Sequence, residues 1–212
     1  MTKTVVHLLR HGEVHNPEKL LYGRLPGYFL SELGLQMADR AAAHFAERDI
    51  TYVVASPLER AQQTARPTAE RFGLAVAIDD RLIEADNVFE GKRVAVGDGA
   101  LREPWAWKYL WNPWRPSWGE PYQQLAARMG GAIESARQAA YGHEAVCVSH
   151  QLPIWIARLA AERKPFIHWP TRRQCSLASV TSLVFEDDRL AAIEYAEPCA
   201  DLVARSNKAT GA

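Results

Sequence analysis

The sequence predicts an α/β protein, built as a three-layer α/β/α sandwich around a mostly parallel central sheet. Short apolar runs alternate along the chain with helical stretches, which is the pattern of strands joined by helices. Several of these runs are apolar throughout, as expected of strands that are buried on both faces. The length of 212 residues suits one domain, so residues 1–212 are expected to form a single unit.

Three strands are expected in the first half of the chain. Residues 4–9 form a short apolar, β-rich run that stops at a turn glycine, Gly12, two residues after Arg10. Residues 52–55 form a second such run and residues 75–78 a third. We expect all three to be buried in the sheet.

Two helices are expected between these strands. The first follows Ser31 and extends to about residue 48. The second starts at Ser56-Pro57-Leu58-Glu59, which offers a serine as N-cap, a proline at the first helical position and a glutamate at the capping-box position. This helix is expected to run to about Phe72, where Gly73 ends it.

The second half of the chain continues the alternation. Residues 120–141 favour a helix, residues 145–149 favour a fourth buried strand, and another helix follows Gln151. The chain closes with an expected pair of strands at residues 179–185 and 191–197. The polar tail from Pro198 onwards is expected to be loose.

Residues 102–121 stand apart from this alternation. They hold five of the seven tryptophans together with four prolines, and prolines at that density argue against a continuous helix. Two interpretations stay open. The segment is either an insertion whose tryptophans pack onto the body of the domain, or a lid or wall over a substrate pocket.

The charge balance and the cysteines narrow the function classes. The 25 basic and 25 acidic residues cancel, so neither nucleic acid nor an anionic membrane is an expected partner. The three cysteines form no CxxC pair, which argues against a zinc ribbon or disulfide framework and favours a reducing compartment. The apolar stretch near the N-terminus is too short for a signal peptide, and no stretch is long enough to span a membrane. We therefore expect a cytoplasmic protein.

Basic side chains occur where several expected strands end. Arg10 and His11 end the first strand. Arg60 lies in the first turn of the helix after the second strand, and His150 follows the fourth. Because the carboxyl ends of strands border the ligand crevice of an open α/β sheet, these side chains are expected to converge there. Helix N-termini add a positive dipole end, and Gly12 would let an anion approach the backbone closely. The expected ligand is a compact anion, namely a phosphate group.

This set of residues fits phosphoryl transfer without a metal or other cofactor. Arginine forks match the oxygens of a phosphate, and a neutral imidazole can attack phosphorus and carry the phosphoryl group covalently. Glu84, which follows the third strand, is the candidate donor of a proton to the leaving alkoxide. His7, His11 and His15 are spaced four apart, but that spacing forms a shared face only on a helix, so no metal site is expected.

These residues also resemble a known family. Leu9-Arg10-His11-Gly12-Glu13 resembles the RHG signature of the histidine phosphatase superfamily, the phosphoglycerate mutase-like proteins. Residues 56–65 (SPLERAQQTA) are similar to its second block, residues 82–91 to the block that supplies the acid, and Ser149-His150 to its second histidine. The resemblance spans about residues 5–185 in the order of the family and implies a phosphoglycerate mutase-like fold.

The resemblance implies a role for each matched residue. His11 would be the nucleophile that forms phosphohistidine. Arg10, Arg60 and His150 would bind the phosphoryl oxygens. Glu84 would protonate the leaving group and then activate the hydrolytic water. A homodimer is a further expectation at the level of the family.

Departures from the pattern of the family concern the substrate contacts. Asn16 lies one place earlier than the usual asparagine, Gln151 stands where a glycine often follows the second histidine, and Met37 replaces a usual glutamine. Arg172 and Arg173 are expected to face solvent. The candidate substrate contacts are Gly12, Asn16, Arg24 and Gln151, beside Arg10, Arg60 and His150.

Three functions stay open, in order of preference. The first is a metal-independent phosphatase that transfers the phosphoryl group of a small phosphorylated metabolite to His11 and then to water. The second is a mutase that returns this group to another hydroxyl of the same substrate, although a tryptophan-rich wall suits a small bisphosphate poorly. The third is a non-catalytic module that binds phosphorylated ligands or a protein partner.

Overall fold

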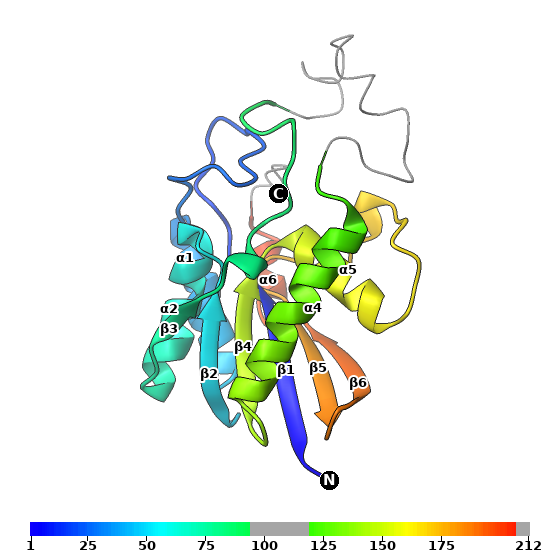
Figure 1. The fold of residues 1–212 in the computed structure, drawn as a ribbon. Helices are drawn as coiled ribbons and strands as arrows, with labels where there is room; N and C mark the ends of the chain where they lie inside the picture. The colour runs from blue at the N-terminus through cyan, green and yellow to red at the C-terminus, as the bar shows by residue number, and fades with distance from the viewer. Residues whose placement is uncertain (94–118, 207–212) are drawn as a thin grey trace.

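A single sheet forms the middle layer of the protein (Figure 1). The computed structural model describes residues 1–93 and 119–206, and the strands of these residues lie in the order β3-β2-β4-β1-β5-β6. The pairs β3–β2, β2–β4 and β4–β1 are parallel, whereas β5 and β6 are antiparallel additions, so the mostly parallel sheet is confirmed. The strands are β1 (Lys3–Arg10), β2 (Ile50–Ala55), β3 (Val76–Ile78), β4 (Glu144–Ser149), β5 (Val180–Glu186) and β6 (Arg189–Ala196).

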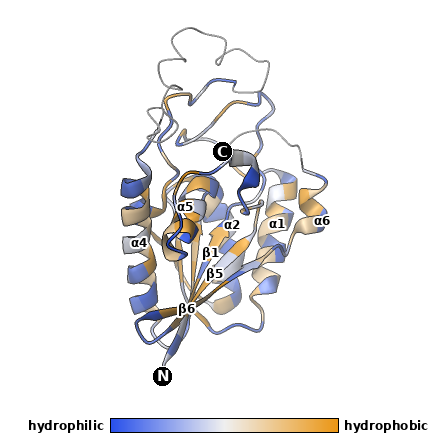
Figure 2. Ribbon diagram, turned by 90° about the vertical axis from the view of Figure 1, so that its right-hand side faces the viewer, coloured by the Kyte–Doolittle hydropathy of each residue, from blue (hydrophilic) through white to orange (hydrophobic). Residues whose placement is uncertain are grey.

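Helices cover both faces of the sheet, as Figure 2 shows with α4 on one side of the strands and α1 and α6 on the other. The helices α1 (Glu32–His44) and α2 (Glu59–Phe72) pack against each other, and so do α4 (Tyr122–Ala139) and α5 (Gln151–Ala161). Alternate side chains of β1 serve the two cores, since Leu8 packs with the α4–α5 layer and Leu9 with the α1–α2 layer.

Local capping explains the start of α1 and the end of α2. The Ser31 hydroxyl accepts a hydrogen bond from the Gly34 N–H at 3.0 Å, so the expected cap is confirmed. The helix ends at His44, earlier than the expected end near residue 48. Gly73 ends α2 in a left-handed conformation with φ of 66°, which glycine adopts without strain.

The expected start of α2 at Ser56 is wrong. The helix begins at Glu59, after Leu58, whose side chain makes no capping hydrogen bond. Glu59 accepts a hydrogen bond from the Gly27 N–H at 3.2 Å instead of closing a capping box. The Ser56 hydroxyl lies 2.8 Å from His150 Nε2, so it is committed to a contact across 94 residues that local spacing does not reveal.

Residues 199–203 are anchored, although they belong to the tail that the sequence predicts to be loose. Cys199 and Leu202 are buried in a small cluster with Met37, and the short helix α6 (Ala200–Val203) carries Leu202. The Cys199 thiol donates to the Met37 carbonyl at 3.4 Å. The expectation of a loose tail from Pro198 is therefore wrong for these residues.

Most of the Trp/Pro-rich segment, residues 102–118, lies outside the described residues, so both interpretations of it stay predictions. Where the description resumes, Gly119 forms an antiparallel bridge with Asn87, and α4 begins at Tyr122. Within residues 1–93 and 119–206, no helix has the length and apolar character that a membrane crossing requires.

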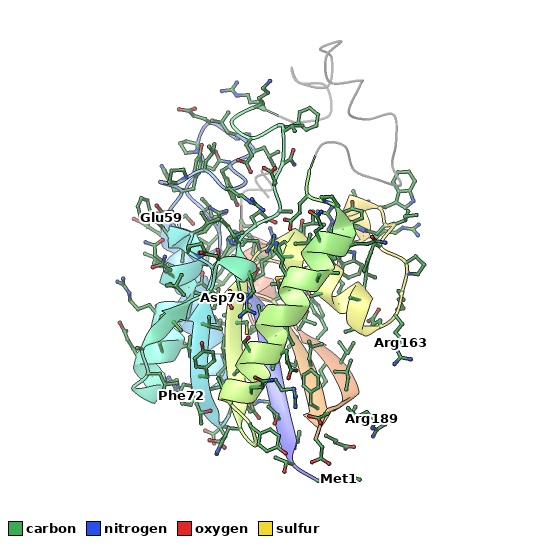
Figure 3. The ribbon with its side chains drawn as sticks, viewed as in Figure 1. Met1, Glu59, Phe72, Asp79, Arg163 and Arg189 are labelled. Atoms are coloured by element: carbon green, nitrogen blue, oxygen red, sulfur yellow. The ribbon has the colours of Figure 1, made fainter. Side chains whose placement is uncertain are left out.

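The parallel strands all end at the same edge of the sheet, which is the upper edge in Figure 1. Figure 3 shows Glu59, at the start of α2, nearer this end than Phe72, at the end of α2, and Met1, at the opposite end of the molecule. Asp79 follows β3 and leads through a 3₁₀ turn, η1 (Asp80–Leu82), towards Glu84. The edge therefore receives the chain segments that carry the predicted catalytic residues.

Candidate active site

His11 and His150 meet because their strands are neighbours. Arg10 of β1 pairs with Ser149 of β4, and the His11 N–H donates to the Ser149 carbonyl at 3.1 Å. The two imidazole rings that follow stand edge to face, with 5.1 Å between their centroids. The parallel register thus brings together two residues that are 139 positions apart, as 150 − 11 gives.

His11 is held in the tautomer that a nucleophile needs. Its ring is fully buried, and Nδ1 lies 2.8 Å from the Gly12 carbonyl, which can only accept a hydrogen bond. Nδ1 therefore carries the proton, and the lone pair is on Nε2, which has no hydrogen-bond partner among the described residues. Burial first, and then the charges of Arg60 and Arg10, hold the pKa of His11 well below its usual 6.5, so the ring stays neutral.

Ser56 determines which nitrogen of His150 faces the site. The Ser56 hydroxyl accepts from the Leu58 N–H at 3.3 Å and lies 2.8 Å from His150 Nε2, to which it can donate. When the hydroxyl donates, the proton of the neutral imidazole is on Nδ1, which is buried and has no partner among the described residues. Burial, followed by the charge of Arg60, also holds the pKa of His150 well below 6.5. In this tautomer, His150 offers an N–H donor beside His11.

Arg10 and Arg60 bring positive charge into the site without a carboxylate to balance it. None of the ion pairs among the described residues involves either side chain. Arg60 is fully buried, donates from Nη2 to the Gly23 carbonyl and lies 4.7 Å from the centre of the Tyr22 ring. Arg10 donates from Nη1 to the Cys175 carbonyl at 2.7 Å. The remaining buried nitrogens, Nε of Arg10 and Nε and Nη1 of Arg60, have no partner among the described residues.

Glu84 is a buried carboxyl with one oxygen engaged. Its Oε1 accepts a hydrogen bond from the Ala85 N–H at 2.8 Å, whereas Oε2 has no partner among the described residues. Burial raises the pKa of Glu84 above its usual 4.5, although the Ala85 N–H and the charges of Arg60, Arg10 and Arg173 act in the opposite direction. A carboxyl in this environment can hold a proton closer to neutral pH than an exposed one.

Arg24, an expected substrate contact, holds the backbone of Glu84. Its Nε donates to the Glu84 carbonyl at 2.7 Å, and its Nη2 forms an ion pair with Glu120 at 3.0 Å. Arg128 joins from the other side, with Nη2 at 3.2 Å from the same carbonyl and Nε at 2.7 Å from Glu120. This clamp of Arg24, Glu120 and Arg128 fixes the backbone of Glu84, and a contact of Arg24 with substrate stays a prediction. The sequence analysis missed Glu120 and Arg128, which no motif marks.

Three further residues that were expected to contact substrate differ in their hydrogen-bond partners. Both ends of the Asn16 side-chain amide bind the backbone of Leu20, at 2.8 and 3.1 Å, so a contact of Asn16 with substrate stays a prediction. Gly12 donates its N–H to Thr64 Oγ1 at 3.1 Å, and a Cβ there would lie 2.6 Å from the Gly34 carbonyl oxygen, so close packing requires this glycine. Gln151 begins α5 and donates to the Cys175 carbonyl, which also binds Arg10.

Arg173 does not face solvent as expected. It is half-buried, and its guanidinium binds His168 Nε2 at 2.8 Å and Gln151 Oε1 at 3.3 Å. Its charge is close enough to lower the pKa of Glu84. Arg172, the neighbouring residue, is exposed as expected. Tyr22, whose buried ring covers Arg60, is a further site residue that the sequence did not indicate, after Glu120 and Arg128.

The unpartnered buried atoms describe what the site can bind. Arg10, Arg60 and His150 supply N–H donors, His11 supplies a lone pair and Glu84 supplies a carboxyl oxygen. Buried polar atoms usually have partners, so a cluster of five such residues at one sheet edge indicates a site for a polar ligand. The donors and the positive charge suit the oxygens of a phosphoryl group. Among residues 1–93 and 119–206, no three His, Cys, Asp or Glu side chains are grouped to hold a metal ion.

Comparison of the sequence with known proteins agrees with the geometry of the site. The family model of the histidine phosphatase superfamily (branch 1) matches residues 6–198. The chain belongs to the histidine phosphatase superfamily. It is 56% identical over 198 residues to the uncharacterized protein Rv0525 of Mycobacterium tuberculosis. The aligned residues cover 93% of this chain and 98% of that protein. It is also similar to the probable phosphoglycerate mutase GpmB of Shigella boydii, with 32% identity over 171 residues, 72% of this chain and 78% of that one.

The chain is also similar to solved structures. The mycobacterial glucosyl-3-phosphoglycerate phosphatase Rv2419c matches with a TM-score of 0.70 and 29% identity, over 86% of this chain and 90% of that one. The same phosphatase in complex with inorganic phosphate matches with a TM-score of 0.65 and 28% identity, over 86% and 89% of the two chains. A phosphoglycerate mutase of Bacillus anthracis, at 18% identity, shares the fold with a TM-score of 0.71, over 96% of both chains. The superfamily and the phosphoglycerate mutase-like fold expected from the sequence are thus confirmed.

Proposed function

We propose that the protein is a metal-independent phosphatase that hydrolyses a small phosphomonoester through a phosphohistidine on His11. The observation that carries this proposal is the environment of His11 Nε2. Its lone pair is buried and unpartnered among the described residues, beside two arginines without a carboxylate partner. Two guanidinium charges match the two charges of a phosphomonoester, and a neutral imidazole is the form of histidine that can attack phosphorus.

In the first step, His11 Nε2 attacks phosphorus and forms an N–P bond, while the P–O bond to the leaving alcohol breaks. Arg10 and Arg60 bind the phosphoryl oxygens, and the N–H of His150 Nδ1 donates to the charge that develops on them. Glu84 transfers its proton to the leaving oxygen, so the alcohol departs neutral. The Gly12 carbonyl, which accepts from Nδ1, stabilises the positive ring that forms.

In the second step, the Glu84 carboxylate takes a proton from a water molecule, and the water oxygen attacks the phosphorus of the phosphohistidine. The N–P bond breaks, inorganic phosphate leaves and His11 returns to its neutral form. Glu84 is again protonated. The same carboxyl therefore acts as acid and then as base, and the clamp on its backbone keeps it in place for both steps.

A mutase is the second candidate, because the chain is similar to a probable phosphoglycerate mutase. It would return the phosphoryl group to another hydroxyl of the substrate instead of to water. Both activities use the same phosphohistidine, so they differ in whether water reaches it.

One assay separates the candidates. Purified protein is tested in EDTA with 4-nitrophenyl phosphate, and in parallel with 3-phosphoglycerate plus a bisphosphate primer. We expect turnover of the aryl ester in EDTA, and a loss of roughly a thousandfold or more in the His11→Ala variant. The matched control is His15→Ala, because His15 is an exposed histidine four residues from His11.

The other results would redirect the assignment. Isomerisation of 3-phosphoglycerate that needs the primer, without release of phosphate, would establish the mutase. Saturable binding of phosphate esters without any turnover would establish a binding module. Turnover that persists in His11→Ala would exclude His11 as the nucleophile.

A further inference from the structure

Arg173 is held in place by neutral groups. Its Nε donates to His168 Nε2 at 2.8 Å, and its Nη1 donates to Gln151 Oε1 at 3.3 Å. His168 can accept this bond at Nε2 because its Nδ1–H donates to the Phe166 carbonyl at 2.7 Å, which leaves the lone pair on Nε2. No ion pair among the described residues involves Arg173, so its positive charge is positioned but not cancelled.

His168, which accepts the hydrogen bond from Arg173, is itself packed against two aromatic rings. The His168 ring lies 5.8 Å from the Tyr122 ring of α4 and 6.0 Å from the Trp155 ring of α5, measured between centroids. These contacts join the segment around Arg173 to two helices of the scaffold. The guanidinium therefore has a defined direction, unlike that of the exposed neighbour Arg172.

Arg173 lies next to the phosphoryl-binding arginines. The Cys175 carbonyl accepts one bond from Arg10 Nη1, at 2.7 Å, and one from Gln151 Nε2, at 3.4 Å. Gln151 in turn binds Arg173 through its other amide end. One glutamine side chain thus separates the third arginine from Arg10.

The charges of the site exceed what one phosphate ester requires. Arg10 and Arg60 already match the two charges of a phosphomonoester, and Glu84 is neutral when it acts as the acid. Arg24 and Arg128 share Glu120 and bind the Glu84 carbonyl, so they are engaged elsewhere. Arg173 is left over as a directed cation, one glutamine side chain from Arg10 and close enough for its charge to act on Glu84, the proposed donor to the leaving alcohol.

We propose that Arg173 binds a second anionic group on the leaving alcohol, so that the preferred substrates are phosphomonoesters of acidic alcohols. The anion is a carboxylate or a second phosphate, since both present oxygens that match a guanidinium fork. This inference rests on the proposed function, because it concerns the alcohol that the phosphatase releases. It makes Arg173 the residue that selects among phosphate esters.

The test compares esters that differ only in charge. Phosphoglycolate is compared with its neutral, nearly isosteric amide, phosphoglycolamide, and the three-carbon homologues are compared in the same way. Ethylene glycol bisphosphate forms the second arm and distinguishes a phosphate from a carboxylate. The measured quantity is the ratio of kcat/KM for the anionic ester to kcat/KM for the amide, taken on one preparation so that the folded fraction cancels.

We expect at least one anionic ester to be preferred by roughly tenfold to a hundredfold in the natural protein. Arg173→Gln should bring the ratio to about one, chiefly through a higher KM for the anionic ester, and Arg173→Lys should keep part of the preference. Arg172→Gln, the matched control, should keep all of it.

Two results would overturn the inference. The first is the absence of any preference for the anionic esters in the natural protein. The second is an Arg173→Gln variant that loses the same factor on acid and amide. If the protein hydrolyses none of the esters, the amides and 4-nitrophenyl phosphate included, the result would instead count against the proposed phosphatase activity.

Discussion

The imidazole of His11 stands edge to face with that of His150, at a centroid distance of 5.1 Å, and both rings are fully buried. Each ring uses one nitrogen to bind a neighbour, the Gly12 carbonyl or the Ser56 hydroxyl, and leaves the other nitrogen unpartnered among the described residues. With the Ser56 hydroxyl donating to His150, the pair presents a lone pair that can attack phosphorus beside an N–H that can donate to a phosphoryl oxygen.

The first prediction concerns the charge of His11. Burial, Arg60 and Arg10 all lower its pKa, so removing one of these positive charges should raise the pKa towards 6.5. In Arg60→Gln, the His11 resonance in an NMR titration should move at higher pH than in the natural protein. Arg66→Gln, an exposed position on the same helix, should leave the titration unchanged. An unaltered His11 titration in Arg60→Gln would show that the charge of Arg60 does not contribute to the lowered pKa.

The second prediction concerns Glu84 as the acid. Glu84→Gln cannot donate a proton, so kcat for an alkyl phosphate should fall by about a hundredfold or more, and kcat for 4-nitrophenyl phosphate much less. In the natural protein, kcat/KM for alkyl esters should fall as pH rises through the raised pKa of Glu84, and Glu84→Gln should lack this limb. Asp86→Asn serves as the control, because Asp86 is an exposed acid two residues away. Equal losses on both esters would indicate a structural role.

The third prediction concerns the clamp on Glu84. Arg128→Met removes a hydrogen bond to the Glu84 carbonyl and an ion pair with Glu120, so the carboxyl should lose its fixed position. We expect kcat for alkyl phosphates to fall by about tenfold to a hundredfold, with a smaller fall for 4-nitrophenyl phosphate. Arg128→Lys should restore part of the loss. A variant that lowers both rates equally would place the role of Arg128 in overall stability.

The fourth prediction concerns the cost of the buried arginines. Arg60 is fully buried without a carboxylate partner, so replacement by methionine should abolish activity yet raise the free energy of unfolding by about 1–3 kcal/mol in urea titrations. Added inorganic phosphate should stabilise the natural protein and not the variant, because an anion that binds only the folded state raises its stability. A destabilised Arg60→Met would show that the contacts of Arg60 with Gly23 and Tyr22 outweigh its desolvation.

Most of the candidate site could be predicted from strand ends and short motifs in the sequence. Arg10, His11, Arg60 and His150 were placed correctly because each lies at the carboxyl end of a strand or in the turn that follows, and parallel strands share that edge. Glu84 depended more on the resemblance to a family, since a single acid after a strand has no periodic signal.

The errors concern contacts between segments that are distant in the chain. Ser56 has the local appearance of a helix cap, but its hydroxyl binds His150. Arg24 and Arg173 have no local pattern, and only the positions of Glu120, Gln151 and His168 decide which way their guanidinium groups point. Such contacts follow from tertiary packing, which a single sequence does not show.

The place of β1 in the middle of the sheet has a consequence for biosynthesis. β1 leaves the ribosome long before its two partners, β4 and β5, which begin at Glu144 and Val180. Because translation adds about 5–20 residues per second, the nascent chain carries this apolar strand without its neighbours for on the order of ten seconds. A chain that stops before β5 lacks one whole side of the strand that positions His11, so truncated products should be caught by chaperones or proteases instead of retaining partial catalysis.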